Sequence, residues 1–127
     1  MPVKIAVVTE DFVNISSHFG RAPFYQVFTV QDGKIIQDEH RAKAYHGQVA
    51  EPRHDHEHHH NHADMLDPIR DCQVLICGGM GLPAFEKAQE AGLQVVLTGG
   101  LMDNAVKAFL EGVLFNDLRR VHRHAGH

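Results

Sequence analysis

A short, almost continuously apolar run near the start of the chain constrains the fold most strongly. Residues 3–8 read Val-Lys-Ile-Ala-Val-Val, with Lys4 as the one polar side chain. Strands that are buried on both faces have this pattern, whereas a half-exposed strand alternates between apolar and polar residues. We therefore expect a central strand whose sheet is covered on both faces.

The remaining elements follow from turn signals and from apolar periodicity. Asp32–Gly33 predicts a hairpin between a strand at 24–30 and a third strand that opens at Lys34. Further along we expect a short helix near 65–69, a strand at 72–77, a helix from Pro83 to Gly92, a strand at 93–97 and a helix at 102–110 capped by Asp103 or a neighbour. The order β-β-β-α-β-α-β-α predicts an α/β fold with a mixed five-stranded sheet and helices on both faces.

This order also predicts where a ligand would bind. If the first strand lies beside the fourth, the loop at 10–21 and the glycine-rich loop after Cys77 emerge at one carboxyl edge of the sheet. Open α/β sheets bind their ligands at that edge.

Length and charge exclude several classes of protein. A chain of 127 residues with a net charge of -4 is expected to form one domain, over about residues 1–115, and to bind no nucleic acid. No apolar run reaches the roughly 20 residues of a membrane span, and no signal peptide is expected. Cys72 and Cys77, on opposite faces if their run is a strand, lie too far apart for a disulfide, which favours a cytoplasmic protein.

The glycine-rich stretch from Cys77 to Gly81 is the strongest local signal. Gly78, Gly79 and Gly81, with Met80 between them, lead from a strand into a helix, where backbone amides can face an anion. Three glycines can also serve only to make a tight turn. The spacing matches neither the phosphate loop nor the dinucleotide fingerprint. Cys77 is either a soft ligand of a metal-sulfide centre or a small buried apolar residue.

A second candidate motif follows the first strand. Ser17, His18, Gly20 and Arg21 lie in one loop, where His18 could ligate a metal and Arg21 could supply a counter-charge for an anionic cluster. The alternative is a polar loop whose side chains only cap its own backbone.

Histidines gather in a biased stretch at about 41–62, which we expect to be a mobile loop. Six imidazoles occupy the nine positions 54–62, and these candidate metal ligands are His54, His56, His58, His59, His60 and His62. Such a tract binds nickel, zinc or copper with adjustable geometry, or it is a solvated loop without a metal. Residues 116–127 form a basic, histidine-containing tail.

Catalysis is not expected. The first strand carries no acidic residue, and the chain shows neither a carboxylate cluster for two-metal chemistry nor a nucleophile elbow. Cys77 and His18 could act as nucleophile and base, but no third, orienting group is identified.

The two loop motifs together resemble the dinitrogenase iron-molybdenum cofactor family, which includes NifX-like proteins and proteins of the orange-protein type. Ile15-Ser16-Ser17-His18-Phe19-Gly20-Arg21-Ala22-Pro23-Phe24 and Ile76-Cys77-Gly78-Gly79-Met80-Gly81 carry the likeness, about 60 residues apart, and it extends from about Lys4 to Leu114. The polyhistidine run departs from the shorter loop that is common in relatives.

The resemblance implies a ribonuclease-H-like fold without nuclease carboxylates. It also implies a non-enzymatic carrier or scaffold for an anionic metal-sulfur cofactor: the iron-molybdenum cofactor, a precursor or a molybdenum-sulfide cluster. A cofactor-assembly or recipient protein would be the partner. Two alternatives stay open: a divalent-metal buffer or delivery protein that acts through the histidine tract, and a regulatory domain that docks on a partner without a ligand.

Overall fold

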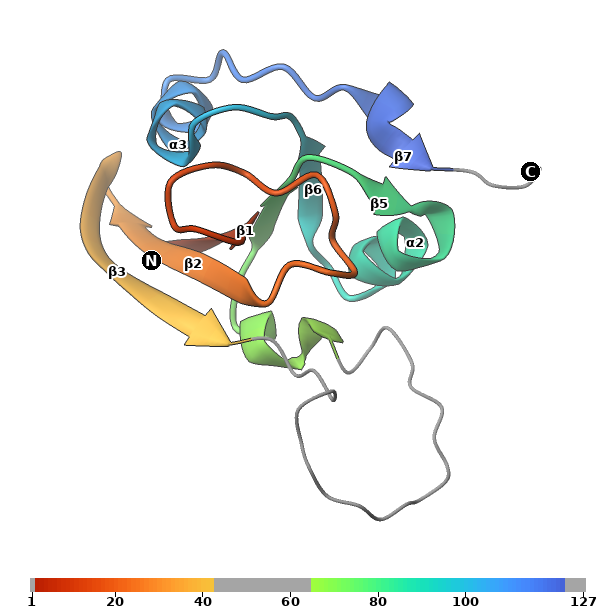
Figure 1. Cartoon of the computed structure of the whole chain (residues 1–127). Coiled ribbons are helices and arrows are strands. Elements are labelled where there is room, and N and C mark those ends of the chain that lie inside the picture. Colours follow the sequence, from red (N-terminus) through yellow and green to blue (C-terminus); the bar gives the residue numbers. More distant parts are fainter. Residues whose placement is uncertain (1, 43–64, 123–127) are drawn as a thin grey trace.

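A computed structural model describes residues 2–42 and 65–122 (Figure 1). Its strands are β1 (Val3–Thr9), β2 (Phe24–Gln31), β3 (Lys34–Ala42), β4 (Val74–Cys77), β5 (Met80–Gly81), β6 (Gln94–Leu97) and β7 (Val121–His122). Its helices are α2 (Leu82–Glu90), α3 (Met102–Leu110) and the short 3-10 helices η2 (Asp67–Ile69) and η3 (Leu118–Arg120). The predicted histidine ligands between 54 and 62 lie outside the described residues.

The main sheet has five strands in the order β3-β2-β1-β4-β6. Strands β1, β2 and β3 form an antiparallel meander, whereas β1, β4 and β6 run parallel to one another. The first strand thus lies beside the fourth, which is the arrangement that the expected ligand edge requires. The mixed five-stranded α/β architecture is confirmed.

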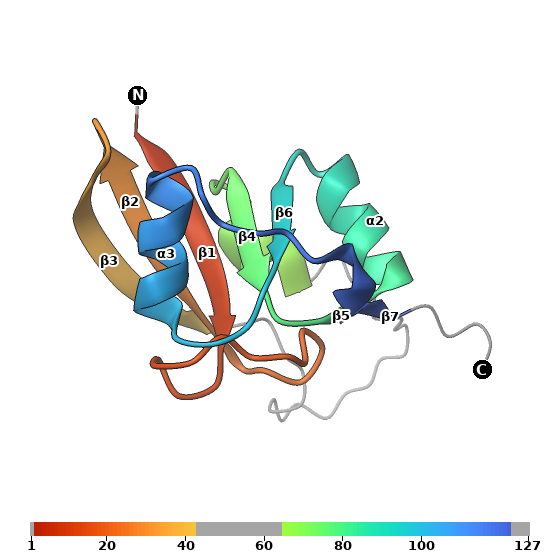
Figure 2. The ribbon, with the colours of Figure 1, turned by 90° about the horizontal axis from the view of Figure 1, so that it is seen from above.

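Two apolar cores cover the two faces of this sheet. One face packs against α2 and η2, and the opposite face packs against α3 (Figures 1 and 2). Every residue of β1 from Ile5 to Thr9 is fully buried, as expected for a strand between two such layers. Because β1 is the central strand, the loop that follows it leaves from the middle of the sheet, at the carboxyl ends of the parallel strands.

Two sequence expectations about the strands need correction. Cys72 and Cys77 belong to the same core rather than to opposite faces, because β4 begins only at Val74 and Cys72 lies in the preceding turn. Arg41 and Ala42, assigned to the histidine-rich loop, are the last residues of β3.

The cap of α3 is Leu101 rather than Asp103, and no side chain caps the helix. Leu101 is held extended by a bridge to Asn14, and the N–H of Met102 donates to the carbonyl of Val13 at 2.9 Å. The loop after β1 therefore satisfies a helix donor that a capping side chain would otherwise take.

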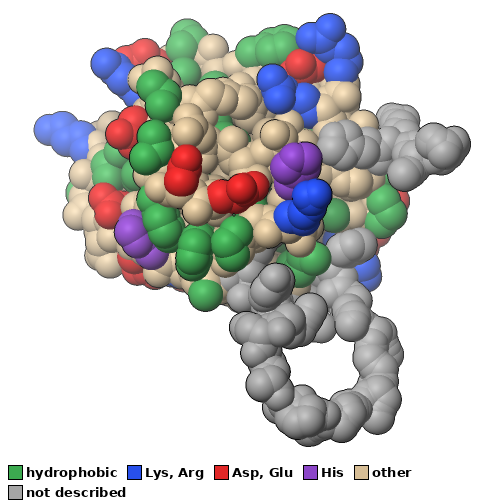
Figure 3. Space-filling view, viewed as in Figure 1, with side chains coloured by type: hydrophobic (Ala, Val, Ile, Leu, Met, Phe, Trp, Pro, Cys, Tyr) green, Lys and Arg blue, Asp and Glu red, His purple; other side chains and the backbone are tan. Residues whose placement is uncertain are grey.

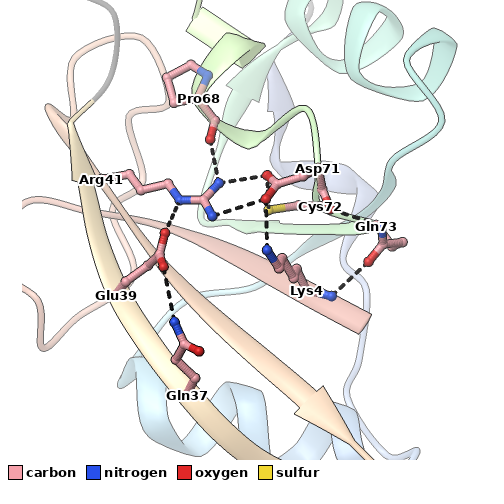
Figure 4. A network of polar contacts seen from close by, with 8 residues as sticks. All are labelled: Lys4, Gln37, Glu39, Arg41, Pro68, Asp71, Cys72 and Gln73. Atoms are coloured by element: carbon pink, nitrogen blue, oxygen red, sulfur yellow. Dashed lines mark hydrogen bonds and ion pairs between the residues drawn. The ribbon is translucent and has the colours of Figure 1, made fainter. Parts of the chain in front are cut away.

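A polar network fastens the far end of β3 to the turn before β4 (Figure 4). The Arg41 guanidinium donates to both carboxylate oxygens of Asp71, at 2.7 and 3.2 Å, and to the carbonyl of Pro68 at 2.7 Å. Lys4 adds a contact of 2.9 Å to the same carboxylate. These hydrogen bonds hold the pKa of Asp71 well below its usual range.

Part of the predicted C-terminal tail packs on the domain. The Asn116 side chain accepts the N–H of Leu97 at 2.8 Å and donates to the carbonyl of Val95 at 3.3 Å, as a neighbouring strand would. Strand β7 then pairs in parallel with β5, with Val121 opposite Met80. Residues 116–122 are thus brought beside the loop that follows β4.

Candidate functional site

The loop at residues 10–23, here called the first loop, leaves the carboxyl end of β1 and is anchored in both cores. Ile15 is buried in the core under α3, whereas Phe19 and Ala22 are buried in the opposite core. These side chains hold the loop across the end of the sheet. Ser16 is buried between them, whereas Ser17, His18 and Arg21 are left at the surface.

Hydrogen bonds within the first loop fix its turn. The Ser16 hydroxyl donates to the Glu10 carboxylate at 2.8 Å and accepts the N–H of His18 at 3.0 Å. Asp11 accepts backbone N–H groups of its own turn, which lowers the pKa of its carboxyl. Both carboxylates therefore take part in shaping the loop. The side chains of His18 and Arg21 are exposed at its rim.

The loop at residues 78–81, here called the glycine loop, docks directly on the first loop. The N–H of Gly78 donates to the carbonyl of Ser16 at 2.8 Å, and the N–H of Phe19 donates to the carbonyl of Gly79 at 3.1 Å. A Cβ added to Gly78 would lie 2.8 Å from the Ser16 oxygen and 2.9 Å from the Ser17 Cα. Gly78 is thus needed for the contact between the two loops.

The two loops line an open cavity of about 200 Å³ at the surface, here called the site cavity. Its lining comes from both predicted motifs: His18, Phe19, Gly20, Arg21, Gly79, Met80 and Gly81. An imidazole and a guanidinium stand in this lining, and among the residues that the structure describes no carboxylate does. Such a cavity suits an anion that also offers a metal to an imidazole.

A second cavity, of about 180 Å³, lies on the other side of His18 and has a different character. It is lined by Glu10, Asp11, Asn14, Ile15, Ser16, Ser17 and His18. His18 therefore separates a cavity with two carboxylates from one with a guanidinium. Figure 3 shows acidic, basic and histidine side chains close together on this face of the molecule.

Cys77 lies beneath the glycine loop, with 0% of its surface exposed. Its Sγ is 3.0 Å from the carbonyl oxygen of Gly79 and 3.8 Å from that of Ser16, and it does not line the site cavity. A direct role for Cys77 as a ligand would require the two loops to separate. That role stays a prediction, as does metal ligation by His18.

Most of the predicted cofactor residues come together in the structure. His18, Gly20, Arg21, Gly79, Met80 and Gly81 line the site cavity, whereas Ser17, Cys77 and Gly78 do not. Within residues 2–42 and 65–122, no group of three or more His, Cys, Asp or Glu side chains is arranged to hold a metal ion. In the same ranges, no helix has the length and apolar character needed to cross a membrane.

Sequence reasoning missed Phe19 and Arg120 at this edge. Phe19 contributes to the lining of the cavity, and the Arg120 guanidinium donates to the carbonyl of Gly78 at 3.1 Å. Phe19 could have been found from the sequence, because it lies inside the motif of the first loop. Arg120 was harder to find, because the β-branched Val121 after it is the one residue there that favours a strand.

Comparison with known proteins settles the family. The family model described as dinitrogenase iron-molybdenum cofactor matches residues 1–112, which include both loops. The chain belongs to the dinitrogenase iron-molybdenum cofactor family. The resemblance expected from the two motifs is therefore confirmed. No curated protein sequence matches the chain.

Solved structures of similar fold support the architecture. The protein PH0822 is 22% identical, with a TM-score of 0.69 over 91% of this chain and 96% of that chain. The apo form of the orange protein from Desulfovibrio gigas is 24% identical, with a TM-score of 0.67 over 90% and 92%. A candidate dinitrogenase from Methanocaldococcus jannaschii is 13% identical, with a TM-score of 0.66 over 92% and 96%. At these identities the likeness shows the fold alone.

Proposed function

We propose that this chain is a non-enzymatic carrier or scaffold for an anionic metal-sulfur cluster. The observation that carries the proposal is the site cavity, in which His18 and Arg21 face the glycine loop and the described part of the chain places no carboxylate in the wall. The cargo would be an iron-molybdenum cofactor, a precursor or a molybdenum-sulfide cluster. Family membership supports this class of cargo.

Each side of the cavity would contribute a different interaction. Arg21 would neutralise negative charge on the cluster sulfides, and the His18 imidazole would ligate a metal at the rim. Gly20, Gly79 and Gly81 keep bulky side chains out of the lining, so that the cargo can approach the backbone. Helix α2 begins directly after Gly81 without a side-chain cap, which leaves N–H groups of its first turn toward this loop.

A carrier must also release its cargo, and the position of the cavity suits release. It lies between two surface loops, and His18 and Arg21 are exposed. The cargo would reach a partner without unfolding of the sheet. We propose that a cofactor-assembly or recipient protein is that partner, and that exchange takes place in the cytoplasm.

The proposal assigns the chain a ribonuclease-H-like topology without hydrolytic chemistry. Strand β1 reads Val-Lys-Ile-Ala-Val-Val-Thr and carries no carboxylate. The two carboxylates that follow it, on Glu10 and Asp11, accept hydrogen bonds from their own loop. A two-metal hydrolase would need such groups to be available as metal ligands.

Anaerobic incubation with tetrathiomolybdate, a molybdenum-sulfide dianion, tests the proposal. Visible absorption that stays with the protein after desalting is the expected result. His18→Ala and Arg21→Ala should each lower retention at least severalfold. Arg70→Ala is the matched control, because Arg70 is exposed and belongs to a cavity lined by η2 and α2 residues. No retained chromophore, or equal retention in all variants, contradicts the proposal.

A second function is favoured by the histidine tract, with six imidazoles in the nine positions 54–62. It is a divalent-metal buffer or delivery protein for nickel, zinc or copper, acting through the tract. Calorimetry with Ni²⁺ and Zn²⁺, on the full chain and on a variant lacking residues 55–61, discriminates the two functions. If the variant loses Ni²⁺ affinity but binds thiomolybdate as the full chain does, the tract and the site cavity are two independent binding sites. If both proteins bind Ni²⁺ with equal affinity, the tract is excluded as the Ni²⁺ site.

A further inference from the structure

Arg120 reaches the glycine loop from the C-terminal segment, behind the site cavity. Strand β7 begins one residue later and pairs with β5, so that Val121 lies opposite Met80. The guanidinium donates from Nη1 to the carbonyl of Gly78 at 3.1 Å. Both terminal nitrogens would lie 3.4 Å from a Cβ at Gly99. Arg120 therefore occupies the space beside two glycines that follow the parallel strands β4 and β6.

The positive charge of Arg120 is weakly neutralised by its neighbours. Asp117 makes its short side-chain contacts with Arg119, at 2.8 and 3.1 Å, whereas the Nε of Arg120 is 3.7 Å from the same carboxylate. That Nε is buried and makes no hydrogen bond with any residue that the structure describes. Gly78 is thus held by a cation whose charge remains available to polarise the peptide group.

The geometry of the peptide bond carries this effect to the cavity side. Among the described residues no peptide bond is cis, and a trans peptide points its C=O and N–H in opposite directions. Because the Gly78 carbonyl faces Arg120, the N–H of Gly79 faces away from Arg120. Gly79 lines the site cavity, and within residues 2–42 and 65–122 its N–H has no acceptor.

We propose that Arg120 is a positioning residue of the cargo site. It fixes the plane of the Gly78–Gly79 peptide and polarises it, so that the N–H of Gly79 donates to a sulfide or oxide of the bound anion. This role rests on the proposed function, since it requires an anion in the site cavity. Arg21 and Arg120 then act from two sides: Arg21 from the lining, and Arg120 through the backbone.

The test compares Arg120→Met with the wild-type chain in anaerobic titrations with tetrathiomolybdate. We expect about tenfold weaker binding, as for the loss of one hydrogen bond to a charged group. Amide spectra of ¹⁵N-labelled protein supply the readout that a purely structural role would not give. In the wild-type chain the Gly79 amide proton should shift downfield on binding. In Arg120→Met that shift should be lost, while the Gly20 amide still responds.

Two further variants make the result specific. Arg70→Met is the matched control, because the Arg70 side chain is 75% exposed and lines a different cavity; it should bind as the wild-type chain does. Arg120→Lys keeps the positive charge and serves as the second variant in case Arg120→Met folds poorly. It should recover part of the affinity for tetrathiomolybdate. Wild-type binding with an unchanged Gly79 shift in both Arg120 variants overturns the role of Arg120 and leaves the carrier function standing. If the wild-type chain does not bind tetrathiomolybdate, both the role of Arg120 and the carrier function are overturned.

Discussion

Gly78→Ala probes the contact on which the whole site depends. Gly78 has an ordinary backbone conformation, so the effect of the substitution comes from space alone. The new Cβ would lie 2.8 Å from the Ser16 oxygen and 2.9 Å from the Ser17 Cα, both of which are backbone atoms. A flexible side chain could move aside, but the first loop must shift as a unit.

The expected loss of stability has two parts. Overpacking of this kind reduces the free energy of unfolding by about 1–3 kcal/mol. A shift of the loop also weakens the hydrogen bond from Gly78 to Ser16, which contributes about 1 kcal/mol. We therefore expect Gly78→Ala to lower the free energy of unfolding by about 2–4 kcal/mol.

Urea denaturation followed by circular dichroism measures this difference. Gly20→Ala is the control, because a Cβ at Gly20 meets nothing within 4 Å. That variant should be unchanged or more stable by up to about 1 kcal/mol. If Gly78→Ala and Gly20→Ala have the same stability, the close docking of the two loops is refuted.

Three further predictions address the rest of the molecule. The Arg41 and Lys4 contacts hold the pKa of Asp71 below its ordinary value. Their contribution to the free energy of unfolding is therefore present above about pH 4 and is lost as the pH falls further. Since the Asp71 side chain is 48% exposed, Asp71→Asn should lower the free energy of unfolding by about 1 kcal/mol at pH 7, and in urea titrations the difference should shrink steadily as the pH falls below about 4. Burial raises the pKa of the Cys72 thiol to about 12, so iodoacetamide should alkylate Cys72 in the native protein far more slowly than in urea; equal rates would contradict its burial. Deletion of residues 117–127 should weaken thiomolybdate binding to the extent seen in Arg120→Met; full binding by the truncated chain would show that the C-terminal segment is dispensable.

The central part of the fold could be predicted because its signals are local. The apolar run of β1 and the Asp32–Gly33 turn each indicate one element, and the parallel crossover rule then restricts the strand order. The same reasoning placed the first loop and the glycine loop at one edge. The hydrogen bonds from Gly78 to Ser16 and from Phe19 to Gly79 agree with that prediction.

The remaining parts depend on tertiary contacts that leave no periodic pattern. Strand β7 has two residues, and it is a strand because β5 lies beside it. Leu101 caps α3 because Asn14 and Val13 hold the chain there, so a search for Ser, Asp or Asn at that position fails. The sequence also does not show that the missing side chain of Gly78 makes room for the first loop. Its role in cofactor binding stays a prediction.

The metal and sulfide content of the protein tests the central claim most directly. The protein would be isolated anaerobically without a nickel column, and molybdenum, iron, nickel, zinc, copper and acid-labile sulfide would be measured per chain. The carrier account predicts molybdenum or iron together with sulfide, both lost when His18 and Arg21 are replaced by alanine and both retained when residues 55–61 are deleted. Nickel, zinc or copper without sulfide, lost only on that deletion, would contradict it.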